Sequence, residues 1–66
     1  MKVTQWFDAW NKPFRKGVYQ TFDDKTPLYQ YWNGKYWGLL FNTIDGAAKF
    51  ANKRSHWQNV KWRGVA

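Results

Sequence analysis

The spacing of apolar residues near the start of the chain predicts a short amphipathic helix. Four apolar side chains recur at intervals that place them on one helical face: Val3, Trp6, Phe7 and Trp10. Pro13 ends this pattern, and a helix of about two turns does not persist alone in water. We therefore expect residues 1–12 to dock their rings on the core. Binding of this face to a membrane surface is the alternative, although the segment lacks a basic face.

Three later stretches alternate β-branched or aromatic residues with polar ones, which is typical of strands. They cover residues 17–22, 28–32 and 35–41. The cluster from Asp23 to Pro27 predicts the first turn. Asn33 and Gly34 predict a two-residue type I′ hairpin turn, in which both residues have positive φ. The sequence therefore predicts an antiparallel meander over residues 17–41.

A two-residue turn fixes the pairing of the second and third strands, with Trp32 opposite Lys35 and Tyr31 opposite Tyr36. One face of the sheet then carries most of the apolar side chains: Leu28, Gln30, Trp32, Lys35, Trp37, Leu39 and Phe41. The other face carries phenols around a glycine: Tyr29, Tyr31, Tyr36, Gly38 and Leu40. Two interpretations of this second face stay open. The first is an exposed binding surface, and the second is a face covered by the rings of the N-terminal segment.

A helix is predicted over residues 43–54. Asn42 or Thr43 provides the N-cap, and Asp45 lies in the first turn. Apolar residues repeat along one side of this helix: Ile44, Ala47, Ala48 and Ala51. Residues 57–65 are expected to form a last strand or an extended tail. The expected fold is α+β in a single domain, residues 1–66: a three-stranded antiparallel β-sheet, or four strands if the C-terminal segment joins it, with one α-helix packed on it.

Composition limits what the chain can be. Of the 66 residues, fifteen are aromatic and none is Cys. A chain of this length buries only about 60% of its unfolded surface, so most of the rings are needed in the core. The absence of Cys excludes disulfides and thiolate metal sites. No apolar run approaches the roughly 20 residues of a membrane span, so we expect no membrane partner.

Charge is concentrated towards the C-terminus. The net charge is +7, and all four acidic residues precede position 46. The segment from 46 to 66 has no acidic side chain and carries five cations: Lys49, Lys53, Arg54, Lys61 and Arg63. Such a segment is typical of a surface that meets a polyanion or an acidic protein. The alternative is that the cations keep a small aromatic-rich protein soluble.

The residues that support catalysis are scarce. His56 is the single histidine, and the neighbouring Ser55 does not form a nucleophile–base pair with it because adjacent side chains diverge. Asp23 and Asp24 are typical turn formers. We therefore expect no enzyme, no metal, no cofactor and no small-molecule substrate.

Aromatic residues interleaved with cations suggest a binding surface. Single-stranded nucleic acid is held by stacking of bases on rings and by cations along the backbone. The candidate binding residues are Tyr29, Tyr31, Lys35, Tyr36, Lys49, Lys53, Arg54, Lys61, Trp62 and Arg63. The same residue types serve a protein partner equally well. For Trp62 the alternative is that its ring anchors the tail in the core.

Three motifs occur in order along the chain: Pro-Phe-Arg-Lys-Gly-Val-Tyr at 13–19, Tyr-Gln-Tyr-Trp-Asn-Gly-Lys-Tyr-Trp at 29–37 and Trp-Arg-Gly at 62–64. This set resembles a family of small proteins encoded by tailed phages and prophages. The sequence departs from the family pattern at Asn33, where Asp is usual, and at Gln20, where Glu is frequent. The resemblance implies a phage accessory protein in the cytoplasm of the infected bacterial host, and it assigns no catalytic or binding residues.

The segment from Trp37 to Ala51 is also similar to the last strand and helix of AP2-type DNA-binding domains, although the Arg-rich strands of that family are missing. This weaker similarity supports the sheet-plus-helix architecture.

The function we expect is that of a small non-enzymatic phage protein that binds an anionic partner, foremost nucleic acid. One alternative is a protein–protein interaction module that inhibits or adapts a host enzyme or defence complex, and a second is a minor virion component. Either a monomer or a small homo-oligomer is compatible with the sequence.

Overall fold

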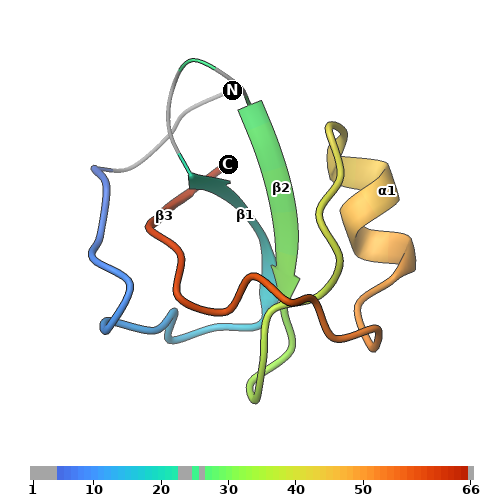
Figure 1. Ribbon diagram of the computed structural model, residues 1–66, viewed down its shortest axis with the longest axis horizontal. Coiled ribbons are helices and arrows are strands. Elements are labelled where there is room, and N and C mark those ends of the chain that lie inside the picture. The colour runs from blue at the N-terminus through green and yellow to red at the C-terminus, as the bar shows by residue number, and fades with distance from the viewer. Residues whose placement is uncertain (1–4, 23–24, 26, 66) are drawn as a thin grey trace.

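The computed structural model describes residues 5–22, 25 and 27–65 of the chain. Within these residues the elements are β1 (Gly17–Phe22), β2 (Pro27–Trp32), α1 (Ile44–Lys49) and β3 (Trp62–Gly64). They form a three-stranded sheet in the order β2-β1-β3, with both strand pairs antiparallel (Figure 1). The expected α+β fold, a three-stranded antiparallel sheet with one helix, is confirmed. The predicted turn residues Asp23 and Asp24 lie outside the described residues.

The third strand of the sheet is not residues 35–41, as predicted, but lies within residues 57–65, where a last strand or an extended tail is expected from the sequence. Residues 35–41 meet β2 only at two isolated bridges, Trp32 with Trp37 and Tyr29 with Phe41. Between these bridges β2 contributes two residues and the partner segment three, so one residue bulges out of the ladder. The third place in the sheet is taken by β3, which pairs with β1.

The turn after β2 explains the change of register. Asn33 does not have the positive φ of a type I′ turn, since Phe22 is the non-glycine residue with positive φ in the described chain. Instead the Oδ1 atom of Asn33 accepts hydrogen bonds from the backbone N–H groups of Lys35 and Tyr36, each at 3.0 Å. This Asx turn makes a four-residue loop, Asn33–Tyr36. Trp32 therefore lies opposite Trp37, and the predicted pairing with Lys35 is wrong.

The N-terminal segment docks, but not as a helix. Phe7 is extended and exchanges two backbone hydrogen bonds with Trp62, at 2.8 and 3.2 Å. Their rings stack with centroids 4.5 Å apart. The prediction of a helix is wrong for the described part of the segment. A two-turn helix is not stable by itself, whereas the edge of β3 offers backbone hydrogen-bond partners to an extended chain. Trp10 is 80% exposed rather than docked, and Val3 lies outside the described residues.

The helix is shorter than the predicted 43–54. Thr43 is the N-cap and accepts a hydrogen bond from the Gly46 N–H at 3.1 Å. Ala47 is buried, whereas Ile44 and Ala48 are exposed, so the apolar stripe is narrower than predicted.

Helix α1 ends at Lys49, and the residues that follow it make contacts outside the helix. The ring of Phe50 stacks on Phe41 with centroids 5.1 Å apart. Beyond it, the carbonyl of Ala51 accepts a hydrogen bond from the Asn33 side chain at 3.1 Å. These contacts hold the residues after α1 against the Asn33–Tyr36 loop, which a continued helix would not allow.

Rings fill the core, as their number predicts. Trp32, Trp37, Val60 and Trp62 are buried together, and three partly buried rings pack against them: Phe7, Tyr19 and Phe22. Trp37 is fully buried, and its ring centroid lies 5.1 Å from that of Trp32. Aromatic burial on this scale is the main source of stability in a chain without disulfides.

A fully buried amide sits beside these rings. Thr21 on β1 donates its hydroxyl hydrogen to Oε1 of Gln30 at 2.8 Å. The Nε2 atom of Gln30 donates to the carbonyls of Gly38 and Trp57, each at 3.0 Å. One side chain of β2 thus joins three other segments of the chain.

We expect Gln30→Leu to lower the free energy of unfolding by about 3 kcal/mol, because two carbonyls would stay buried without a donor. Urea unfolding followed by tryptophan fluorescence measures this. The matched control is Asn59→Leu, which replaces an amide at an exposed position and should change stability by less than about 0.5 kcal/mol. Equal losses in the two variants would contradict the role given to Gln30.

Candidate nucleic-acid interface

Three segments that are distant in sequence meet at the end of the molecule where β2 finishes and β1 begins (Figure 1). They are residues 12–16, the Asn33–Tyr36 loop and residues 50–54. The Lys16 side chain lies beside Gly34, where an added Cβ would come within 3.3 Å of the Lys16 Cε. The Tyr36 hydroxyl donates to the carbonyl of Asn52 at 2.9 Å. These contacts make one continuous surface from the three segments.

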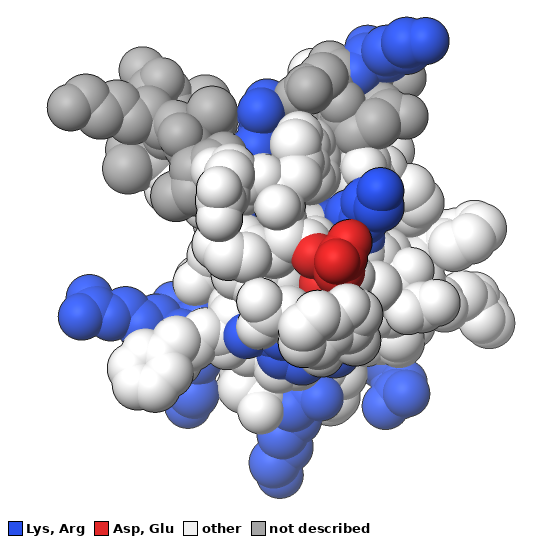
Figure 2. All heavy atoms as spheres, turned by 90° about the vertical axis from the view of Figure 1, so that its left-hand side faces the viewer, with Lys and Arg blue, Asp and Glu red and all other residues white. Residues whose placement is uncertain are grey.

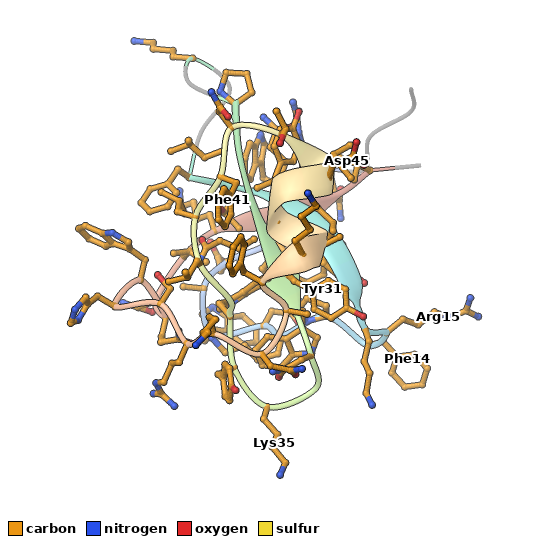
Figure 3. All side chains as sticks on the ribbon, turned by 90° about the vertical axis from the view of Figure 1, so that its right-hand side faces the viewer. Phe14, Arg15, Tyr31, Lys35, Phe41 and Asp45 are labelled. Carbon is orange, nitrogen blue, oxygen red and sulfur yellow. The ribbon has the colours of Figure 1, made fainter. Side chains whose placement is uncertain are left out.

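We call this end of the molecule the loop-end surface. It is built from two rings and five exposed cations: Phe14, Tyr36, Arg15, Lys16, Lys35, Lys53 and Arg54. In Figure 3 Lys35 is at the tip of the loop at the bottom of the view, and Phe14 and Arg15 project from the lower right side. Figure 2 shows basic side chains along the same lower edge. Asp45 lies towards the other end of the molecule (Figure 3). Five of the cations that the structure describes thus lie at the end of the molecule away from Asp45.

Not every nearby cation is available to a ligand. The Lys12 ammonium donates to the carbonyls of Ala9 and Gln58, at 2.8 and 3.2 Å, and lies 6.0 Å from the centroid of the Trp32 ring. These contacts hold the segment before Phe14 against the core. We therefore assign Lys12 a structural role and leave it out of the loop-end surface.

Phe14 is the most exposed large apolar side chain described, at 99%. It is nevertheless presented from an anchored segment. Pro13 before it is buried, and the carbonyl of Arg15 after it accepts a hydrogen bond from the Tyr19 hydroxyl at 2.7 Å. A ring held in solvent by its neighbours offers a flat face to a partner.

Phe14, Arg15 and Lys16 were not among the binding residues predicted from the sequence. The charge pattern along the chain points to its last third, whereas the fold brings residues 14–16 next to the hairpin loop. The available signal was local: an aromatic residue between a proline and two cations, in a stretch without strand or helix periodicity.

The fold brings four of the predicted binding residues together at this end: Lys35, Tyr36, Lys53 and Arg54. The Arg54 guanidinium lies 5.6 Å from the centroid of the Tyr36 ring, which is a cation–π contact. Lys49 lies in the last turn of α1, next to the 50–54 segment. Lys61 lies at the opposite end, where the Phe22 N–H donates to its carbonyl at 3.1 Å.

The predicted patch of three tyrosines does not form. The four-residue loop takes Tyr36 out of the sheet. Tyr29 and Tyr31 are half-buried on β2, against which α1 packs; Figure 3 shows Tyr31 close to the end of the helix. The partial cover comes from α1. Of the N-terminal rings, Phe7 stacks on Trp62 and Trp6 lies against Arg63, both on β3, and Trp10 is exposed.

The last two predicted residues serve the fold. Trp62 is buried and stacked on Phe7, and its indole N–H donates to the carbonyl of Asn11. It anchors the tail and does not offer its ring for stacking. Arg63 donates from Nε to the Gln20 side chain at 2.9 Å, and its guanidinium lies 4.8 Å from the centroid of the Trp6 ring.

We also searched the described residues for a metal site and for a membrane-spanning helix. In the part of the chain that the structure describes, no three His, Cys, Asp or Glu side chains come together as metal ligands. None of the helices formed by these residues is long and apolar enough to cross a membrane. Comparisons with protein-family models, curated protein sequences and solved structures find no match. Function therefore has to be inferred from the surface of the chain itself.

The support of the 12–16 segment by Tyr19 is sensitive to pH. Burial raises the pKa of the Tyr19 phenol above its ordinary value of 10.0, and the positive charge of Arg15 opposes this rise. The folded chain thus favours the neutral phenol, so the contribution of Tyr19 to stability is complete below pH 10 and is lost as the pH rises through the raised pKa. In urea unfolding we expect Tyr19→Phe to lose less stability than the wild type between pH 9 and 11.

At pH 8 the same variant should be less stable by about 1 kcal/mol, because the hydrogen bond to Arg15 is absent. Tyr36→Phe is the matched control, since it removes a phenol–carbonyl hydrogen bond at the loop instead of the core. If both variants flatten the pH dependence equally, the effect does not originate at Tyr19.

Proposed function

We propose that the protein is a non-enzymatic module that binds single-stranded nucleic acid on the loop-end surface. The observation that carries the proposal is the gathering of five exposed cations from three segments around Phe14 and Tyr36. The cations neutralise phosphates, which supplies affinity for any strand. The exposed Phe14 ring supplies a stacking face for an unpaired base.

A single strand fits this surface better than a duplex. The bases of a duplex are already stacked on each other, so a projecting Phe ring has no free base face to meet. Readout of the major groove needs a helix or a two-stranded ribbon that enters it. The six-residue α1 packs against β2 and β1, and the other face of the sheet carries the buried rings of the core. The sheet therefore has no bare face to lay on a duplex, as the AP2-type similarity would require.

The surface is partly organised before a strand arrives. Tyr36 is held by its hydrogen bond to Asn52 and by the guanidinium of Arg54. Because these side chains are already placed, less conformational entropy is lost on binding. Lys16 and Lys35 extend the charge around the loop towards Phe14.

The resemblance to small phage and prophage proteins supports the biological setting that we include in the proposal. The module would act as an accessory protein in the cytoplasm of an infected bacterium, as a monomer or a small homo-oligomer.

Binding to an acidic host protein is a second candidate, because three large rings are more than half exposed. Trp10, Phe14 and Trp57 are 80%, 99% and 57% exposed, and aromatic residues dominate protein–protein hot spots. Affinity capture from bacterial lysate with and without nuclease separates the candidates. A stoichiometric protein that remains after nuclease treatment supports this second candidate, whereas loss of all captured material favours nucleic acid.

Salt titration tests the electrostatic part of the proposal. We expect the affinity for a labelled single-stranded oligonucleotide, measured by fluorescence anisotropy, to fall with salt with a log–log slope of about −3, as for four or five phosphate contacts. The double variant Lys16→Ser/Lys35→Ser should make this slope shallower by about 1.4. Absence of binding at about 50 mM salt would overturn the proposal.

The control for this variant is Lys25→Ser/Lys61→Ser, which removes the same charge away from the loop-end surface. It should keep most of the affinity. An equal loss in both double variants would show that total charge, and not this surface, determines binding.

Substitution of the exposed ring tests stacking separately. Phe14→Ser should weaken binding by about tenfold or more without changing the salt slope, since one stacked base contributes about 1–3 kcal/mol. Trp57→Ser is the matched control, because Trp57 is also exposed but contacts Phe22, away from the loop. If Phe14→Ser binds like the wild type, the ring does not stack on a base.

A further inference from the structure

A pocket opens beside the loop-end surface, in the segment that follows Arg54. It has a volume of about 400 Å³ and is lined by Arg54, Ser55, His56 and Gln58. All four side chains are polar, and none is acidic. The pocket shares Arg54 with the loop-end surface, so a ligand that runs along that surface reaches it directly.

The walls of this pocket are fixed by hydrogen bonds to the segment beside β2. The Gln58 side chain accepts from the Trp37 N–H and donates to the Trp37 carbonyl, both at 2.8 Å. It also donates to the carbonyl of Ser55 at 2.7 Å, and the Ser55 N–H donates to the Trp37 carbonyl at 3.1 Å. Gln58 is therefore a positioning residue that holds the pocket open, and its amide is already used.

The other three side chains keep donors for a ligand. Ser55 is 6% exposed, and its Oγ accepts a hydrogen bond from the Trp57 N–H at 2.9 Å. The hydroxyl hydrogen itself has no acceptor among the described residues. Arg54 brings a permanent positive charge, and the exposed His56 brings an imidazole N–H. A hydroxyl, a guanidinium and an imidazole around one space are suited to an anion with several oxygens.

We propose that this pocket binds the terminal phosphomonoester of a nucleic-acid strand, an inference that rests on the proposed function. A phosphodiester inside a strand has two free oxygens and one negative charge. A terminal phosphate has three free oxygens and nearly two charges, which matches the three donor groups, one of which is the guanidinium of Arg54. The loop-end surface then holds the strand, and the pocket selects strands by their end.

The experiment compares three single-stranded oligonucleotides of one sequence, with a 5′-phosphate, a 3′-phosphate or hydroxyl groups at both ends. Competition anisotropy measures their affinities for the folded wild-type protein. We expect one of the phosphorylated strands to bind about tenfold more tightly than the hydroxyl-ended strand, which is the effect of one charge-assisted hydrogen bond. The strand that gains affinity identifies which end enters the pocket.

Variants then test whether the preference for a terminal phosphate depends on the pocket residues. Ser55→Ala and His56→Ala should each reduce it to less than threefold and leave the affinity for the hydroxyl-ended strand unchanged. Asn59→Ala, at an exposed position next to the pocket residues, is the control and should keep the full preference. If the buried Ser55 variant does not fold, the exposed His56 variant still tests the proposal.

Three negative outcomes are distinguishable. Equal binding of all three strands by the wild type would overturn the phosphate pocket and leave the proposed function intact. Absence of binding to every strand would overturn both. A preference that survives in both variants would place the terminal phosphate elsewhere on the protein.

Discussion

The hydrogen bonds of the buried Gln30 amide fix the arrangement of the chain on one side of the sheet. Through Thr21, Gly38 and Trp57 this side chain connects β2 to β1 and to two segments without regular secondary structure. Rings alone would pack here in more than one way, because hydrophobic contact has little directional preference. A fully satisfied buried amide has one geometry. The irregular segments next to β2 therefore have a defined position, to which three backbone hydrogen bonds between β2 and residues 38–41 also contribute.

The loop-end surface and the pocket both follow from this arrangement. Residues 37 and 38 are held between β2 and residues 54–55, through the bridge of Gly38 with Arg54 and the hydrogen bond of Ser55 to Trp37. Arg54 is thereby placed between the hairpin loop and the pocket. On the other side of the loop, Tyr19 and Lys12 fix the segment that presents Phe14. The proposed binding groups from three parts of the chain are thus held together by contacts with the core.

The local sequence pattern predicted β1, β2 and an N-cap at Asn42 or Thr43, because strand alternation and helix capping depend on neighbouring residues. It failed at Asn33, where the side chain closes an Asx turn that competes with the type I′ turn and shifts the register by two residues. It also failed at residues 35–41, whose alternation predicts a full strand but which meet β2 only at isolated bridges. β3 lies within residues 57–65, for which a strand or an extended tail was predicted. Phe14 and the pocket depend on contacts between distant segments, which a single sequence does not display.

The order of the strands has a consequence for biosynthesis. The central strand β1 has β2 as its neighbour on one side, but its other neighbour lies far downstream, as the contact between Gln20 and Arg63 across 43 residues shows. Phe7, near the start, in turn rests on β3. While the ribosome is still adding residues before 62, β1 has one bare edge and the early rings have no support. The sheet is completed only after residues 62–64 have been made, so its strands come together as one unit.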